Sequence, residues 1–161
     1  MKRVLLMAAV AVMVIAMGTT AFAVNSQTND VTVSAKVLGV CYFNTASASI
    51  AFADIDPSTI SPVTATTTLQ YACTTHTVAP TITQDAGISA CAGATAGGLG
   101  SDLYLKNGSD CMKYTLSAPA LTATGFASFS NELVTATIGV SAFQSQPAGV
   151  YSDTVVLTVN Y

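Results

Sequence analysis

Residues 149–161 read G-V-Y-S-D-T-V-V-L-T-V-N-Y, and this stretch decides how we interpret the rest of the chain. Its large apolar and aromatic residues share one parity, and the other parity is mostly polar. The first set consists of Tyr151, Val155, Leu157, Val159 and Tyr161. A period of two, built from β-branched and aromatic residues, predicts a strand with one buried face. Because an apolar strand with an open edge promotes aggregation, we expect a neighbour along each edge.

One neighbour is predicted from residues 133–143, which alternate more strictly than the final stretch. The connection between the two is residues 144–148, and its Pro147 suits a loop or turn. The second neighbour of the final strand is not evident from the pattern, and the function depends on what it is.

The rest of the chain also reads as short strands separated by turn signals. The expected strands are residues 30–43, 50–55, 63–73, 78–84, 102–106 and 113–117. Asn107-Gly108 predicts a hairpin between the last two, and Phe126 and Phe129 are expected to plug the core beneath a loop. After residue 23 no stretch has helical periodicity, so the sequence predicts an all-β, immunoglobulin-like antiparallel β-sandwich.

The first 23 residues are interpreted as a secretory signal peptide. Lys2 and Arg3 precede a wholly apolar run over residues 4–17, and residues 21–23 read Ala-Phe-Ala, a small-x-small cleavage site. A membrane anchor is the alternative, but the run is shorter than the roughly 18 to 20 residues that a spanning helix needs. We therefore expect residues 24–161 to form one exported domain that does not stay in the membrane.

The charge balance of residues 24–161 argues against nucleic acid and anionic membranes as partners. Three lysines oppose eight carboxylates, and no basic cluster is present. Threonine, serine, alanine and valine dominate the stretch instead, which suits strands and a neutral, hydroxyl-rich surface.

The four cysteines, Cys41, Cys73, Cys91 and Cys111, are expected to form two disulfides in an exported chain. Three pairings are possible. We favour the sequential one, Cys41 with Cys73 and Cys91 with Cys111, because each closed loop then links neighbouring strands. A zinc site is not expected, because no C-x-x-C pair occurs and the chain has a single histidine.

No catalytic constellation can be assembled from the sequence. His76 has no accompanying nucleophile motif. Asp54 and Asp56 flank a turn marked by Pro57, and turn formation explains at least one of them. We therefore expect no enzyme activity, no metal and no cofactor.

The alternating stretch before Cys41 has two interpretations. Val31, Val33 and Ala35 alternate with Thr32, Ser34 and Lys36. The stretch is either the first strand of its own sandwich, or a strand whose apolar side chains fill a groove in another subunit, as in strand addition. Alternation alone does not separate the two.

The chain resembles the spore coat protein U domain family, which includes pilin subunits of archaic (Csu-type) chaperone–usher pili. The residues that carry the resemblance are the C-terminal Tyr-x-Asp alternation over 148–161, the alternating stretch before Cys41, the span from Cys41 to Cys73, and Ile50-Ala51-Phe52 between them. Cys91 and Cys111 have no counterpart that we can assign from the family.

The resemblance implies an incomplete immunoglobulin-like fold in residues 38–161, with a groove beside the last strand and a family disulfide between Cys41 and Cys73. A periplasmic chaperone fills the groove first, and the N-terminal donor strand of the next subunit then replaces it. Carried over here, the donor is residues 24–37, which inserts Val31, Val33, Ala35 and Val37. The acceptor strand presents Tyr151, Val155, Leu157, Val159 and Tyr161.

The expected function is thus that of a structural subunit, exported through the periplasm, which polymerises into a cell-surface pilus for adhesion and biofilm formation. The expected partners are a periplasmic chaperone, an outer-membrane usher and other copies or related subunits. Two alternatives stay open: a spore- or cell-coat protein of the same fold, and a self-contained extracellular binding module.

Overall fold

The computed structural model describes residues 28–75, 79–123, 125–127 and 129–161. The expected signal peptide and His76 lie outside these residues. The chain divides into two compact units, Met1–Lys36 and Val37–Tyr161. In the first unit, the described residues 28–36 are exposed and belong to no strand. The folded body is the second unit.

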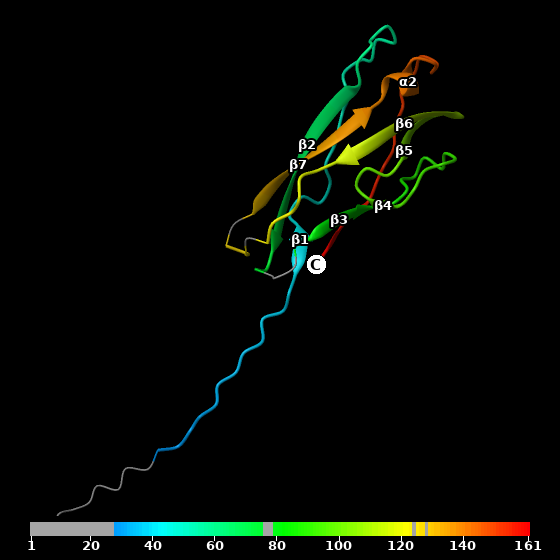
Figure 1. Cartoon of the computed structure of the whole chain (residues 1–161). Helices are drawn as coiled ribbons and strands as arrows, with labels where there is room; N and C mark the ends of the chain where they lie inside the picture. The colour runs from blue at the N-terminus through cyan, green and yellow to red at the C-terminus, as the bar shows by residue number, and fades with distance from the viewer. Residues whose placement is uncertain (1–27, 76–78, 124, 128) are drawn as a thin grey trace, which may run out of the picture. The chain divides into compact units, whose positions relative to one another are not determined.

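The body is an all-β structure of two antiparallel sheets, as the sequence predicts (Figure 1). The five-stranded sheet has the order β1-β2-β7-β6-β5, and the three-stranded sheet has the order β4-β3-β8. The strands are β1 (Cys41–Phe43), β2 (Val63–Cys73), β3 (Thr81–Gln84), β4 (Gly97–Gly98), β5 (Leu103–Asn107), β6 (Asp110–Ser117), β7 (Ser130–Ile138) and β8 (Leu157–Asn160). One short helix, α2 (Val140–Phe143), follows β7.

The five-stranded sheet is built on β2, whose bounds are those that the alternation predicts. It pairs along most of its length with β7, from Val63 opposite Ile138 to Tyr71 opposite Ser130. Alternate residues of β2 are exposed, and Leu69 and Tyr71 point into the core, which is the arrangement expected of a strand with one solvated face. At its other end β2 pairs with β1.

The hairpin of β5 and β6 confirms the turn expected at Asn107-Gly108. Asn107 pairs with Asp110, so the two-residue loop is Gly108-Ser109. Gly108 has a φ of 59°, a left-handed conformation that glycine adopts without steric cost.

The core lies between the two sheets. One cluster of buried side chains comes from the five-stranded sheet and α2: Leu69, Leu103, Met112, Tyr114, Leu116, Val134, Ala136, Ile138 and Phe143. A second cluster joins Tyr71 and Cys73 to Ile82 of β3, and Leu157 and Val159 of β8 pack against it. Burial of these apolar faces is the main force that holds the sheets together.

The prediction that residues 133–143 form the strand beside the final strand is wrong. β8 pairs with β3, whereas β7 lies in the other sheet between β2 and β6. The strand predicted over 133–143 ends at Ile138, and α2 then turns Phe143 into the core. Alternation shows which face of a strand is buried, but it does not name the strand beside it.

Three further expectations differ from the structure. Residues 50–55 form no strand, although Ile50, Phe52 and Ile55 pack against the core. Within residues 30–43 only Cys41–Phe43 is a strand. Phe126 and Phe129 do not plug the core, because they are 45% and 44% exposed and form ring contacts with Tyr42.

Candidate functional site

The final stretch is paired along one edge only within the described residues. Its even-numbered residues face β3 and the loop that follows it: the C=O of Val156 accepts from the N–H of Asp85 at 3.1 Å, and the C=O of Thr154 accepts from Ile88 at 3.1 Å. Backbone groups in an antiparallel strand point to alternate edges. The odd-numbered residues therefore direct their N–H and C=O groups to the opposite edge, where no described strand is paired with β8.

The side chains of this stretch alternate as predicted, but the regular strand is shorter than residues 149–161. Four of the five predicted acceptor residues are half-buried and pack against the core clusters: Tyr151, Val155, Leu157 and Val159. Tyr161 is 56% exposed. Ser152 forms an isolated bridge with Lys106 of β5, and the regular strand begins only at Leu157.

A cleft of about 540 Å³ lies where this stretch begins. One wall is formed by residues 51–55 and Pro57, and the other by residues 146–151. Its floor is apolar, with Leu105, Met112, Ile138 and Phe143. Asp54 is the one charged residue in the lining, and it is exposed. An elongated apolar side chain or strand end suits such a cleft better than a polar small molecule.

Asp153 fastens the stretch to the loop after β3. Its Oδ1 accepts hydrogen bonds from the backbone N–H groups of Ile88 at 3.0 Å and Ser89 at 3.1 Å, and its Oδ2 accepts from the Tyr114 hydroxyl at 3.0 Å. Burial raises the pKa of Tyr114, and the neighbouring Asp153 charge raises it further. Tyr114 therefore stays protonated and donates to the carboxylate. Sequence reasoning quoted Asp153 within the Tyr-x-Asp pattern but gave it no role.

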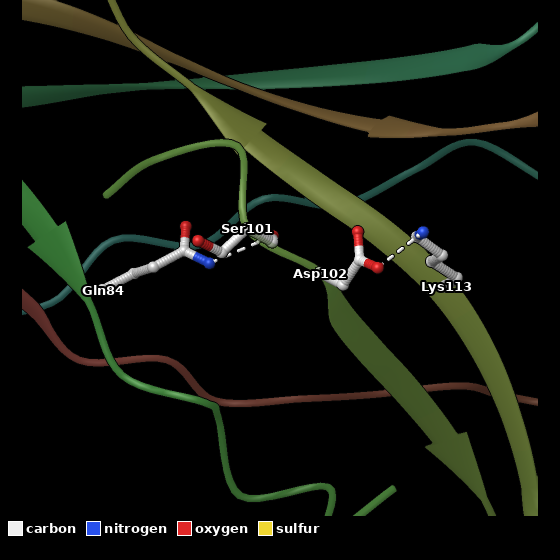
Figure 2. Close-up of polar contacts among 4 residues, drawn as sticks. All are labelled: Gln84, Ser101, Asp102 and Lys113. Carbon is white, nitrogen blue, oxygen red and sulfur yellow. Dashed lines mark hydrogen bonds and ion pairs between the residues drawn. The ribbon is translucent and has the colours of Figure 1, made fainter. Parts of the chain in front are cut away.

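Two further contacts hold the surroundings of β3 in place (Figure 2). The Gln84 side chain donates from Nε2 to the C=O of Ser101 at 3.2 Å, which ties β3 to the segment that leads into β5. Next to it, the Nζ of Lys113 on β6 lies 2.7 Å from Oδ2 of Asp102. β3 also pairs with β4 on one side and with β8 on the other, whereas β8 pairs with β3 alone among the described strands.

The predicted donor residues lie in the stretch before β1. Val31 and Val33 are 82% and 88% exposed, and Ala35 and Val37 are also exposed. All four belong to no strand. Their alternation with polar residues is therefore not explained by pairing within the described chain.

Both disulfides are present in the structure, with Cys41 joined to Cys73 and Cys91 to Cys111. The first links β1 to β2. The second links the loop after β3 to β6, so that the loop held by Asp153 is also held covalently. This is the sequential pairing that the sequence favoured.

The described residues offer no site for a metal, since no group of three or more His, Cys, Asp or Glu side chains gathers among them. In the same part of the chain, no helix has the length and apolar character needed to cross a membrane. The chemistry of the site is that of an unpaired β-edge above an apolar cleft.

Comparisons with known proteins give similarity to a solved structure but no match to a protein family. The sequence matches no protein-family model, and no curated protein matches it. A solved structure with limited similarity is the CsuC–CsuE chaperone–tip adhesion subunit pre-assembly complex from archaic chaperone–usher Csu pili of Acinetobacter baumannii. The identity is 19%, the TM-score is 0.41, and the match covers 78% of this chain and 40% of the other. The chain thus spans less than half of the chain it matches.

Proposed function

We propose that this chain is an exported structural subunit that polymerises by donor-strand complementation into a chaperone–usher pilus. Residues 24–37 of one copy are the donor. The receiving copy binds them along the unpaired edge of the final stretch, residues 151–160, between this stretch and the wall of the cleft that carries Phe52 and Ile55.

The observation that carries the proposal is that one chain has both a strand edge without a described partner and an alternating segment that belongs to no described strand. β8 has a half-buried apolar face and an edge with no described partner strand. The stretch before β1 has the alternation of a strand with one buried face, yet its valines are exposed. Each feature lacks what the other supplies, and strand addition between copies satisfies both.

Two energy terms favour the junction. Burying the apolar side chains of the donor contributes roughly 1 to 2 kcal/mol each, which for three valines is about 3 to 6 kcal/mol. The backbone bonds formed along β8 add a net contribution of roughly 0.5 to 1.5 kcal/mol each. Closing the open edge also removes a surface that would otherwise promote uncontrolled strand pairing.

The partners follow from the same groove. Before assembly, a periplasmic chaperone covers the edge of β8 and keeps subunits apart, and an outer-membrane usher is the place of exchange. The resulting fibre lies at the cell surface and serves adhesion and biofilm formation. The two cysteine pairs suit the oxidising compartments through which such a subunit passes.

An unheated SDS gel tests the proposal. The chain is produced in a periplasm with its candidate chaperone and usher, with and without residues 24–36. A ladder of SDS-resistant multimers that disappears with the deletion supports donor-strand polymerisation. A single monomer band, under conditions where a known pilin gives a ladder, contradicts the proposal and favours a coat protein or a self-contained binding module.

A matched pair of substitutions separates the donor role from a general effect of charge. Val33→Asp places a carboxylate on the inserted face and should abolish the ladder, because an unpaired buried charge costs several kcal/mol. Thr32→Asp adds the same charge at the adjacent position of the opposite face and should preserve it. If Val33→Asp prevents folding even with the chaperone, the stretch belongs to its own domain and the donor assignment is wrong.

A further inference from the structure

Within the folded body, β1 and the cleft lie at opposite ends of β2. The donor continues through Val37 into β1, which pairs with the end of β2 at Cys73. The cleft is floored by Ile138, which pairs with Val63 at the start of β2. At about 3.3 Å per residue, the two ends of β2 are separated by roughly 30 Å. A donor therefore leaves the body at one end, and the cleft opens at the other.

This arrangement decides the direction in which a donor from one copy lies along β8 of another. The C-terminal part of β8 is at the β1 end, since Cys41, Phe43 and Val159 share one core cluster. A donor parallel to β8 would bring the β1 ends of both copies together, at the place from which the second donor also leaves. An antiparallel donor joins the β1 end of one copy to the cleft end of the next, a head-to-tail contact that repeats along a fibre.

The alternation of both strands then restricts the donor to registers that differ by steps of two residues. Directly opposed residues of an antiparallel pair share a face, so inward donor residues must lie opposite inward residues of the final stretch. With Val37 opposite Tyr151 at the cleft, Ala35 lies opposite Asp153, Val33 opposite Val155 and Val31 opposite Leu157. The smallest inserted side chain thus meets the one polar inward residue.

In this register Lys36 lies on the outward face beside the cleft. It is the single cationic residue of the chain between Arg3 and Lys106, and it is exposed. Asp54 is the single charged residue in the cleft lining, and it is also exposed, whereas its neighbours Phe52 and Ile55 pack against the core. Outward residues on adjacent strands are close enough to pair.

Building on the proposed function, we propose that Lys36 of one copy forms an ion pair with Asp54 of the copy that receives its donor segment. The pair sets the register, because a slip of two residues keeps the inserted face apolar but moves Lys36 about 7 Å along the strand. It also selects donors that carry a cation at this position, which makes Asp54 a specificity-determining residue of the groove.

Charge reversal in the mature chain tests this pair. The initial rate of multimer formation is followed by light scattering at 20 mM and 500 mM NaCl. Lys36→Glu and Asp54→Lys should each slow assembly about three- to tenfold at low salt, and the double variant should return to within twofold of the wild type. The differences should shrink at high salt, because exposed charges are screened.

Asp56→Lys is the matched control. Asp56 is exposed and two residues from Asp54, but it does not line the cleft, and its Oδ1 accepts from the N–H of Ser58 at 2.8 Å. Combining it with Lys36→Glu should not restore the rate. Equal rescue by Asp56→Lys, or no rescue by Asp54→Lys, overturns the proposed pair.

A cysteine pair gives a second readout that does not depend on the size of a charge effect. The Lys36→Cys/Asp54→Cys chain should form multimers that survive boiling in SDS without reductant and dissolve with it, whereas Lys36→Cys/Asp56→Cys should not. Absence of this covalent ladder, while unheated wild-type multimers persist, refutes the register and leaves the donor-strand function standing. Absence of wild-type multimers altogether refutes the proposed function itself.

Discussion

Replacing Asp153 by alanine should destabilise the folded body more than any other single polar substitution in the final stretch. The carboxylate holds three donors: the N–H groups of Ile88 and Ser89 and the hydroxyl of Tyr114. Ile88 keeps a second acceptor, the C=O of Thr154. Ser89 and Tyr114 are buried, with 4% and 6% exposure, and each would lose its acceptor.

The magnitude follows from these two orphaned donors. An unsatisfied buried polar group costs about 1 to 3 kcal/mol, so Asp153→Ala should cost roughly 3 kcal/mol. Asp153→Asn retains one oxygen for the two N–H groups and should cost about 1 kcal/mol. Tyr114→Phe removes the hydroxyl together with its need for an acceptor, and should also cost about 1 kcal/mol.

Urea unfolding of residues 24–161, followed by circular dichroism, measures these changes. With a slope of about 1.5 kcal/mol per molar urea, Asp153→Ala should lower the midpoint by about 2 M. In the double variant Asp153→Ala/Tyr114→Phe, the decrease in the free energy of unfolding should be smaller than the sum of the two single decreases by about 1 kcal/mol. The reason is that phenylalanine at position 114 has no hydroxyl left without an acceptor. Strict additivity, or a loss below 1 kcal/mol for Asp153→Ala, contradicts the role assigned to this carboxylate.

Three other predictions concern positions around the groove and the core. In the same urea assay, Gly87→Ala should lower the free energy of unfolding by about 2 kcal/mol or more, because Gly87 has a φ of 71° and a Cβ there would meet the Asp153 carboxylate. Gly108→Ala is the control: Gly108 has a φ of 59° but open space around it, so this variant should lose only about 1 kcal/mol. Equal losses of stability in the two variants would contradict crowding at Gly87. Glu132→Gln should raise the free energy of unfolding at pH 7, because Glu132 is 6% exposed and burial raises the pKa of its carboxyl. Because the raised pKa of Glu132 in the folded state favours its protonated form, the wild type should lose stability as pH rises through that pKa. The glutamine variant should lack this loss. The same dependence of the free energy of unfolding on pH in both proteins would refute the prediction. Replacing both Cys91 and Cys111 by serine should lower the free energy of unfolding by about 3 kcal/mol, because the disulfide closes a loop with a sequence separation of 20. The urea midpoint measures this change. A change below 1 kcal/mol would show that the loop between the two cysteines is held without the disulfide.

The sequence predicted the parts of the fold that depend on a local pattern. β2 alternates between more buried and exposed residues from Val63 to Tyr71 and ends at the disulfide-bonded Cys73, and its predicted and observed bounds agree. The hairpin at Asn107-Gly108 was predicted because its turn needs a residue that tolerates a left-handed conformation. Each of these features is specified by residues close together in the chain.

The parts that could not be predicted depend on contacts between distant residues. Residues 133–138 and 157–160 both alternate, but the pattern does not show that β3 pairs with β8 while β2 and β6 flank β7. Phe126 and Phe129 were misplaced because an aromatic residue in a loop contacts either the core or another exposed ring, here Tyr42. The cleft was missed because its walls are about 90 residues apart in the sequence.

The contacts around β8 restrain one of its two edges in the described chain. An apolar strand supported on one edge tends to collapse onto its core or to pair with any free strand. Here the backbone bonds to Asp85 and Ile88, the Asp153 carboxylate and the Cys91–Cys111 bridge all restrain the side of β8 that faces β3. The opposite side is left without such contacts in the described chain. In the proposed assembly these restraints do not involve the donor, so the acceptor strand is ordered before a donor arrives and less of the binding energy is lost in ordering it.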